Sequence, residues 1–252
     1  MEVSGGPTTA MTQHPKNYLD RGPWVPATAD CYQTLAPSTL DLWRISLEQP
    51  AQIDILSEDE LDRLNRYRFA ADRRKFAVAR SSLRQILARY MQTNPADLIF
   101  DYGPYGKPSL HNENSLQFNL SHSGEYALCG VATQVVGVDI EQLRSMERLD
   151  GLIKRCLAPT EQQALASVPS VQQSAGFLRY WTCKEAYLKA TGQGISESLT
   201  AIEVELEPQP RLKGPQQPWQ LQVFTPCKGY TAATVVPTGI THTRLWTYKT
   251  SL

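Results

Sequence analysis

Two carboxylates stand one residue apart at the end of the apolar segment Val136–Glu141. If this segment is a strand, side chains alternate between its faces, so Asp139 and Glu141 point the same way while Val138 and Ile140 enter a core. Carboxylates held side by side repel each other unless a cation lies between them, and a hard ion such as Mg²⁺ prefers oxygen ligands. The alternative is an ordinary strand end with two solvated acids, and the pattern alone does not exclude it.

A helix is expected over residues 177–190, and it would carry an acid and an amine on one face. Trp181, Glu185 and Lys189 are spaced at i, i+4 and i+8, so their side chains share that face. Gly192 is expected to end the helix. Glu185 and Lys189 could equally form a surface ion pair, which contributes little to stability. The spacing alone does not decide between the two readings.

The segment Ser121–Gly124 follows an alternating strand over residues 116–120 and is expected to form a turn. Its serine hydroxyls, the His122 imidazole and its backbone N–H groups would lie close together, which suits an anion. His122 could bind a phosphate as a cation or as a neutral donor. A hydrolase that uses serine and histidine is the alternative, although no acid that would orient the histidine is evident.

Arginine is concentrated between Arg63 and Arg89, where the apolar positions predict a helix with one buried face. Most of these arginines are expected on the solvated face. Arg80 differs because it lies among small residues on a helix otherwise committed to packing, so its planar group could reach an inner phosphate. A looser phosphate clamp could be formed by the residues that open this helix, namely Arg73, Arg74 and Lys75.

Lys107 stands between a glycine and a proline in a short loop. Gly106 permits close approach of the backbone, and Pro108 stiffens the exit from the loop. The amine is therefore presented on a rigid loop. An exposed turn lysine without a ligand is the alternative, and the loop alone would favour it.

The rest of the chain mixes strands and helices, which predicts an α+β fold. A first strand is expected over residues 40–47, and Ser57–Glu60 has the form of a capping box, so a helix should start there. Two strands, over residues 126–132 and 135–141, are close enough to predict an antiparallel hairpin that turns near Thr133. Sheet completion is expected from the alternating segments at residues 201–206, 219–224 and 230–236.

The composition limits the class of protein. The formal net charge is zero, which argues against a dedicated nucleic-acid binder because such proteins usually carry a basic excess. Five cysteines form no C-x-x-C pair, so neither a disulfide framework nor a zinc site is expected. The sequence shows no secretory signal and no apolar run that could span a membrane, so a cytoplasmic protein is expected. Residues 1–37 are expected to form a partly mobile extension.

Four segments together resemble the 4′-phosphopantetheinyl transferases of the Sfp type, both in their residues and in their order. The resemblance covers roughly residues 40–236, and the basic helix around Arg80 lies where the family carries its upstream phosphate-binding residues. The matching segments are Gly106–Pro108, Phe118–Ser123, Val136–Glu141 and Trp181–Lys189.

This resemblance implies a fold and an activity. The fold would be a monomeric pseudo-dimer of two similar α+β subdomains, residues 38–136 and 137–252, with a coenzyme A cleft between them. The enzyme would move the 4′-phosphopantetheine arm from coenzyme A to a serine of an apo acyl carrier or peptidyl carrier protein and release adenosine 3′,5′-bisphosphate. Carriers of fatty-acid, polyketide and nonribosomal-peptide synthesis all remain open as partners.

Carried over by position, the resemblance makes Asp139, Glu141 and Glu185 the ligands of Mg²⁺, with Mn²⁺ as an alternative ion. The catalytic residues would be Asp139, Glu185 and Lys189. We hypothesise that Glu185 accepts the proton of the carrier serine, with His122 as the second choice. Contacts to the phosphates of coenzyme A would come from Lys107 and the adjoining Pro108, and from Ser121, His122 and Lys189. Contacts to its adenosine end would come from Arg80 with Arg73, Arg74 or Lys75.

Two rival functions use the same residues. A metal-dependent phosphoester hydrolase would cleave coenzyme A without a carrier, and a non-catalytic protein would bind coenzyme A or a carrier without moving the arm. Because carriers are usually acidic helical bundles, we expect them to dock on the basic and partly apolar region of residues 142–180, together with the rim of the cleft. Four cations of that region are expected to contact the carrier, namely Arg144, Arg148, Lys154 and Arg155.

Overall fold

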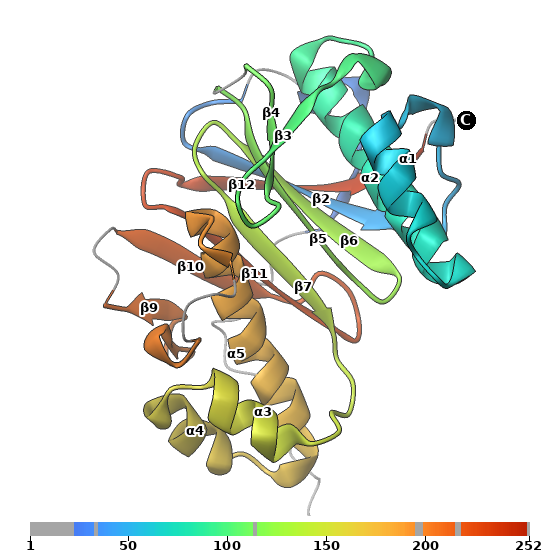
Figure 1. Cartoon of the computed structure of the whole chain (residues 1–252). Helices are drawn as coiled ribbons and strands as arrows, with labels where there is room; N and C mark the ends of the chain where they lie inside the picture. Colours follow the sequence, from blue (N-terminus) through green and yellow to red (C-terminus); the bar gives the residue numbers. More distant parts are fainter. Residues whose placement is uncertain (1–22, 33–34, 113–114, 195–198, 215–217, 251–252) are drawn as a thin grey trace, which may run out of the picture.

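The computed structural model describes residues 23–32, 35–112, 115–194, 199–214 and 218–250 (Figure 1). Most of the extension expected over residues 1–37 lies outside these ranges. Within the described part of that segment, the Trp24 ring packs against the Phe224 ring at a centroid distance of 6.5 Å, and Arg44 lies over the Trp24 ring. This end of the extension is therefore attached to the folded chain.

A five-stranded sheet forms the N-terminal half, in the order β1-β12-β2-β6-β5. Strand β2 lies in the middle of it and is buried along most of its length, because Leu40, Leu42 and Ile45 all meet apolar neighbours. The strands are β1 (Val25–Pro26), β2 (Thr39–Ser46), β5 (Gln117–Ser123), β6 (Tyr126–Ala132) and β12 (His242–Tyr248).

Strand β12 corrects the division expected at residue 136. It pairs in parallel with β2, from His242 opposite Thr39 to Tyr248 opposite Ile45. The C-terminal end of the chain therefore completes the N-terminal sheet, and Figure 1 shows the red strand β12 beside the blue strand β2. The sequence did not predict β12, because its mostly half-exposed positions lack a clean alternation.

Helix α2 (Ala70–Met91) covers one face of this sheet and packs on it through Val78, Leu83 and Ile86. Helix α1 (Glu58–Asn65) begins where the capping box predicts, and the Ser57 N–H donates to the Glu60 carboxylate at 3.0 Å. The loop that carries Lys107 joins the small hairpin of β3 (Phe100–Tyr102) and β4 (Pro108–Leu110). Short 3-10 helices are η1 (Ala29–Tyr32), η2 (Ile53–Ile55) and η3 (Pro95–Asp97).

A three-stranded antiparallel sheet in the order β10-β11-β7 forms the C-terminal half, and helix α5 (Ser170–Thr191) packs on β7 and β11. Helix α5 ends at Gly192, which has a left-handed φ of 73°, as predicted. Both halves combine a sheet with helices, so the predicted α+β class is confirmed. The other elements are β7 (Gly137–Gln142), α3 (Leu149–Cys156), α4 (Pro159–Ala166), η5 (Leu199–Ala201), β8 (Glu203–Glu205), β9 (Arg211–Lys213), β10 (Trp219–Phe224) and β11 (Tyr230–Pro237).

Two predictions about the strands near the junction of the halves are wrong, namely the hairpin of β6 and β7 and the turn at Ser121. Strands β6 and β7 do not form a hairpin, because β6 already pairs with β2 and β5 on its two edges while β7 pairs with β11. The connection after Ala132 instead carries the chain from one sheet to the other. Ser121 and His122 lie within strand β5 rather than in a turn, which begins at Gly124 with a φ of 56°. Among the helices of the described ranges, none is both long and apolar enough to cross a membrane.

An ion pair between a buried carboxylate and a partly exposed arginine joins β12 to β2. Asp41 on β2 is fully buried, and its two carboxylate oxygens accept hydrogen bonds from Arg244 Nε and Nη2 at 2.5 and 2.7 Å. The hydroxyl of Tyr90 on α2 donates to the same carboxylate. Arg244 and Asp41 are also opposite each other in the strand pairing, so the ladder and the ion pair specify the same register.

We expect Arg244→Leu to lower the free energy of unfolding by about 3 kcal/mol, because it leaves the Asp41 carboxylate buried without its cation. Chemical denaturation of both proteins measures the difference. The matched control is Arg211→Leu, whose partner Glu205 lies at the surface, with side chains 65% and 28% exposed. Loss of such an exposed pair should cost less than about 1 kcal/mol. Equal losses of unfolding free energy in the two variants would contradict the role assigned to the pair of Asp41 and Arg244.

Candidate active site

Asp139, Ser121 and Lys189 come from three different elements and meet in one cluster. Asp139 on β7 is only 4% exposed, and its Oδ1 accepts hydrogen bonds from Ser121 Oγ at 2.7 Å and from Lys189 Nζ at 2.6 Å. Lys189 Nζ also donates to Ser121 Oγ at 2.9 Å. A buried carboxylate requires such a cation and donor, because burial of an unpaired charge is costly.

Helix α5 reaches this position because Gly137 leaves room for it. A Cβ atom on Gly137 would lie 1.9 Å from the Ala186 carbonyl oxygen and 2.5 Å from the Ala190 nitrogen. The backbone of α5 therefore lies directly against β7. Glycine within a strand is typical of such close approach, and here it places the helix face with Glu185 and Lys189 beside the strand that carries Asp139.

Glu141 and Glu185 are half-buried beside this cluster, and burial raises the pKa of each. The pKa of Glu141 is lowered in turn by Ser123, whose hydroxyl donates to Oε2 at 2.7 Å. Lys189 lowers the pKa of Glu185, while the charges of Asp139 and Glu141 raise it. The three acids therefore repel one another, which is the condition that a bound cation would relieve.

The three acids do not yet converge on one point. In the described part of the chain, no group of three His, Cys, Asp or Glu side chains is arranged to hold a metal ion. Within the same part, however, Asp139 Oδ2 and Glu185 Oε1 are buried and have no hydrogen-bond partner. Such oxygens suit a hard cation. The donor chemistry fits Mg²⁺ at these two residues, whereas Glu141 is engaged with Ser123.

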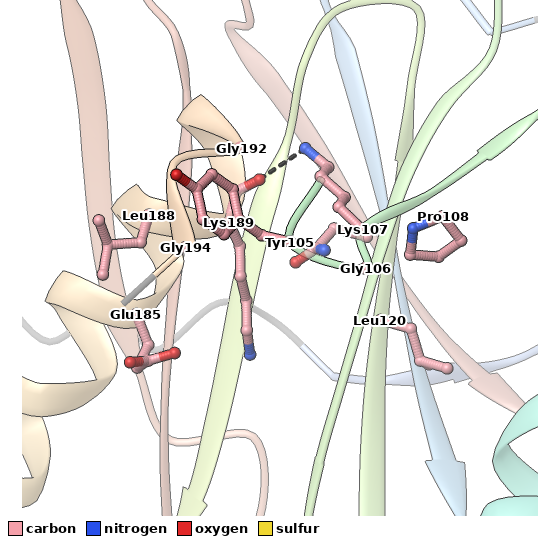
Figure 2. Close-up of a pocket in the computed structure, with 11 residues that line it drawn as sticks. Tyr105, Gly106, Lys107, Pro108, Leu120, Glu185, Leu188, Lys189, Gly192 and Gly194 are labelled. Atoms are coloured by element: carbon pink, nitrogen blue, oxygen red, sulfur yellow. Dashed lines mark hydrogen bonds between the residues drawn. The ribbon is translucent and has the colours of Figure 1, made fainter. Parts of the chain in front are cut away.

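A pocket of about 400 Å³ opens beside the cluster, between the β3–β4 connection, strand β5 and the end of α5 (Figure 2). Its walls thus come from both halves of the chain. The residues that line it include Tyr105, Lys107, Pro108, Asn119, Leu120, Glu185, Leu188 and Lys189.

Figure 2 shows Lys107 reaching across this pocket to the C-terminal end of α5. Its Nζ donates to the backbone carbonyls of Lys189 at 2.5 Å and of Val136 at 3.5 Å. A positive charge is favourable at the carbonyl end of a helix, although burial lowers the pKa of Lys107. Lys107 therefore lies at the predicted pocket, and its amine is bonded to backbone oxygens there.

His122 lies at the far end of β5 and keeps an exposed surface. Neighbouring protein atoms still lower its pKa through desolvation, and the nearby cations Lys189, Lys75 and Arg63 lower it further. Because burial and these cations disfavour the charged form of His122, its imidazole would offer an anion an N–H donor. Arg63 was not among the predicted site residues, because sequence reasoning placed it on a solvated helix face.

The residues that open α2 lie near the β5–β6 turn. Lys75 Nζ is 2.8 Å from Glu125 Oε1, and Arg74 Nη2 is 3.8 Å from the other oxygen of that carboxylate. Arg73 is exposed. The charge of Lys75 also lowers the pKa of His122, so the start of α2 and the end of β5 act on each other electrostatically.

Arg80 is a correction to the predicted site. It is 6% exposed, its Nε donates to Glu60 Oε1 at 2.6 Å, and its guanidinium lies 4.8 Å from the centre of the Phe100 ring. Arg84 binds the other oxygen of the same Glu60 at 2.6 Å. Arg80 therefore joins α1 and β3 to α2 inside the N-terminal half and does not line the pocket.

Sequence reasoning missed three residues that position the site, although it named the segments that contain them. Gly137 admits α5, Ser123 holds Glu141, and Asn119 lines the pocket and accepts the Val138 N–H at 2.8 Å. Strand alternation could have found two of them, because residues 119, 121 and 123 must share one face of β5.

Comparison with known proteins agrees with this arrangement. Residues 42–134 match the family model "4′-phosphopantetheinyl transferase, N-terminal", and residues 135–235 match that of the 4′-phosphopantetheinyl transferase superfamily. The 4′-phosphopantetheinyl transferase HetI of Nostoc sp. is 42% identical over 235 residues, which cover 89% of this chain and 98% of that protein. The chain belongs to the 4′-phosphopantetheinyl transferase superfamily. The family predicted from the motifs, and its status as an enzyme, are thus confirmed.

Two further similar proteins match less of the chain than this relative does. The 4′-phosphopantetheinyl transferase Sfp of Bacillus subtilis is 28% identical over 156 residues, or 61% of this chain and 68% of that protein. A solved holo-(acyl-carrier-protein) synthase from Bacillus anthracis is 28% identical, covers 40% of this chain and 92% of its own, and has a TM-score of 0.37. The two family models meet between residues 134 and 135, close to the proposed boundary at residue 136.

We expect Gly137→Ala to displace α5 from β7, because the added methyl group would overlap the helix backbone. Lys189 and Glu185 would move relative to Asp139, and a misplacement of about 1 Å can cost roughly 100-fold in rate. Transferase activity and melting temperature should both fall. The control is Gly151→Ala in α3, where no atom lies within 4 Å and alanine favours the helix. Full activity in Gly137→Ala would refute this account of the helix–strand contact.

Proposed function

We propose that this transferase moves the 4′-phosphopantetheine arm of coenzyme A to a serine of an apo acyl carrier or peptidyl carrier protein, with release of adenosine 3′,5′-bisphosphate. Attachment of that arm to carriers is the reaction of the superfamily. The observation that carries the proposal is the cluster of Asp139, Ser121 and Lys189 beside the pocket. Both walls of the pocket come from one chain, which favours a monomer, and we propose that it works in the cytoplasm.

Coenzyme A carries a diphosphate and a separate 3′-phosphate, so its binding needs positive charge at two places. Lys107 and Lys189 border the pocket and would face the diphosphate. The second basic group would be centred on Lys75, with His122 as a neutral N–H donor, and would take the phosphate at the adenosine end. Arg73 and Arg74, at the start of α2, would extend that group.

Mg²⁺ would be held by Asp139 and Glu185, each of which has a buried oxygen free of hydrogen bonds. Glu141 would join them once its carboxylate leaves Ser123. When bound, the ion supplies positive charge that neutralises the diphosphate. Mn²⁺ accepts the same oxygen ligands and is the alternative.

The transfer itself requires a base and charge neutralisation. The serine oxygen of the carrier bonds to the phosphorus that bears the pantetheine arm, the bond from that phosphorus to the bridging oxygen breaks, and its electron pair leaves with adenosine 3′,5′-bisphosphate. Glu185 would accept the serine proton, because its carboxylate borders the pocket and would lie beside the proposed ion and the attacking oxygen. Lys189 would neutralise developing charge. His122 is the second choice for the base, although its cationic surroundings suit a phosphate better.

Mass spectrometry of carriers tests this function. Full-length protein, coenzyme A and Mg²⁺ are incubated with apo acyl carrier and apo peptidyl carrier proteins. We expect a carrier serine to gain the mass of phosphopantetheine, with one adenosine 3′,5′-bisphosphate released per transfer. Hydrolysis of coenzyme A without a carrier would favour the rival hydrolase. Binding without any gain in mass would favour a non-catalytic protein. Either result would overturn the proposal.

The variant Glu185→Gln tests whether the Glu185 carboxylate accepts the proton of the carrier serine. Loss of a general base should lower turnover at saturating Mg²⁺ by at least about 100-fold and remove the acidic limb of the pH–rate profile. Calorimetric titration with Mg²⁺ alone reports whether the ion is still bound. The exposed Glu147 provides the control, and Glu147→Gln should keep wild-type turnover. Unchanged turnover in Glu185→Gln would exclude it as the base.

Carrier docking is expected at the exposed cations around α3, namely Arg144, Arg148, Lys154 and Arg155. Reversing all four charges should raise the KM for the carrier about tenfold or more, since each exposed ion pair contributes up to about 1 kcal/mol. The KM for coenzyme A should change little. Added salt should reduce the difference in carrier KM between the variant and the wild type. The control reverses Arg66 and Arg68, which are exposed and follow the end of α1 in the other half. An unchanged carrier KM would refute this docking site.

A further inference from the structure

Strands β5 and β7 are the facing edges of the two sheets. Strand β5 ends the order β1-β12-β2-β6-β5, and β7 ends the order β10-β11-β7. The two strands are close neighbours, yet over the described residues no backbone ladder joins them. Adjacent edge strands normally satisfy their N–H and C=O groups by pairing with each other. Another kind of contact must therefore join the two halves along this line.

Side chains of β5 supply that contact. Asn119 Oδ1 accepts the Val138 N–H at 2.8 Å, and Ser123 Oγ accepts the Gln142 N–H at 3.1 Å. Between them, Ser121 donates to Asp139. Positions 119, 121 and 123 alternate along the strand, so their side chains leave β5 on the same side. A row of side chains thus bridges β5 to β7 where a ladder would otherwise run.

Among these three side chains, Asn119 binds the backbone directly before Asp139. Its side chain is 4% exposed, and the hydrogen bond to the Val138 N–H is buried. A buried N–H without an acceptor is costly, so this bond is maintained in the folded protein. Val138 directly precedes Asp139, and the position of its nitrogen therefore limits where the Asp139 carboxylate can lie.

We propose that Asn119 is a positioning residue: its side chain sets the spacing of β5 and β7 and thereby keeps Asp139 within hydrogen-bond distance of Ser121 and Lys189. The kinetic consequence rests on the proposed transferase function. The role of Asn119 in setting the strand spacing does not rest on that function, because the spacing can be tested on the protein without substrates.

Three variants test this role. Asn119→Leu keeps a similar volume and removes the acceptor, whereas Asn119→Asp keeps an acceptor oxygen. Tyr248→Phe removes a different buried hydrogen bond, from Tyr248 to Gln85 in the core of the N-terminal half. It controls for general loss of stability.

The first measurement is amide hydrogen exchange resolved by residue. In Asn119→Leu, the Val138 amide should exchange about tenfold faster than in the wild type, beyond any change shared by β11 amides such as Thr234. Asn119→Asp should retain the protection of Val138. In Tyr248→Phe, the exchange rate of the Val138 amide should change no more than the rates of the other sheet amides. Equal protection of Val138 in Asn119→Leu and the wild type would overturn the proposal, as would equal loss in the Asp and Leu variants.

The second measurement is steady-state transfer to a carrier. Asn119→Leu should lower kcat by tenfold or more, with less than about a threefold change in the KM for coenzyme A, because the defect lies in the placement of Asp139. Tyr248→Phe should keep both constants. A wild-type kcat in Asn119→Leu would overturn the positioning role. If the wild-type protein itself transfers no arm, the proposed function fails, and the exchange measurement still decides whether Asn119 sets the strand spacing.

Discussion

The negative charge of Asp139 lies almost completely buried at the line where the two halves of the chain meet. A carboxylate in such a place is stable only while a cation and a donor remain in contact with it. Lys189 provides the cation from α5, and Ser121 provides the donor from β5. Each partner depends on further contacts: α5 on the absence of a side chain at Gly137, and β5 on its side-chain bonds to β7. The folding of both halves is thus linked to the compensation of one charge.

The same compensation of charge also explains how the acids are oriented. Lys189 and Ser121 occupy one oxygen of Asp139, and Ser123 occupies one oxygen of Glu141, while oxygens of Asp139 and Glu185 remain without hydrogen bonds. The site therefore has ligands of the right chemistry that are partly engaged with neighbouring donors. Binding of a divalent ion would exchange some of these donor contacts for metal contacts, so ion affinity would depend on how easily Ser123 and Lys189 release their partners.

Features that depend on a few neighbouring residues were predictable from the sequence. The alternation over residues 136–141 placed Asp139 and Glu141 on one side of a strand, and the four-residue spacing placed Glu185 and Lys189 on one side of a helix. The start of α1 at its capping box and the end of α5 at Gly192 were predictable for the same reason. The family resemblance then connected elements that lie far apart in the chain, and this connection could not come from spacing alone.

Features that depend on a choice among distant partners were not predictable. The sequence shows Arg80 as a cation among small residues, but not that Glu60, 20 residues earlier, is buried beside it. It shows two apolar strands after residue 125, but not that β6 already has neighbours on both edges. The bridging role of Asn119 depends in the same way on β7, a strand that follows it by nearly 20 residues.

The place of β12 in the N-terminal sheet has a consequence for the nascent chain. As the ribosome delivers the polypeptide, β2 and β6 emerge long before residues 242–248, so one edge of β2 stays open until those residues have been made. A gene fragment cut at residue 235, where the family match ends, would leave that edge open permanently and remove the partner of Asp41. Such a truncated product would expose a long, apolar strand edge, which favours aggregation.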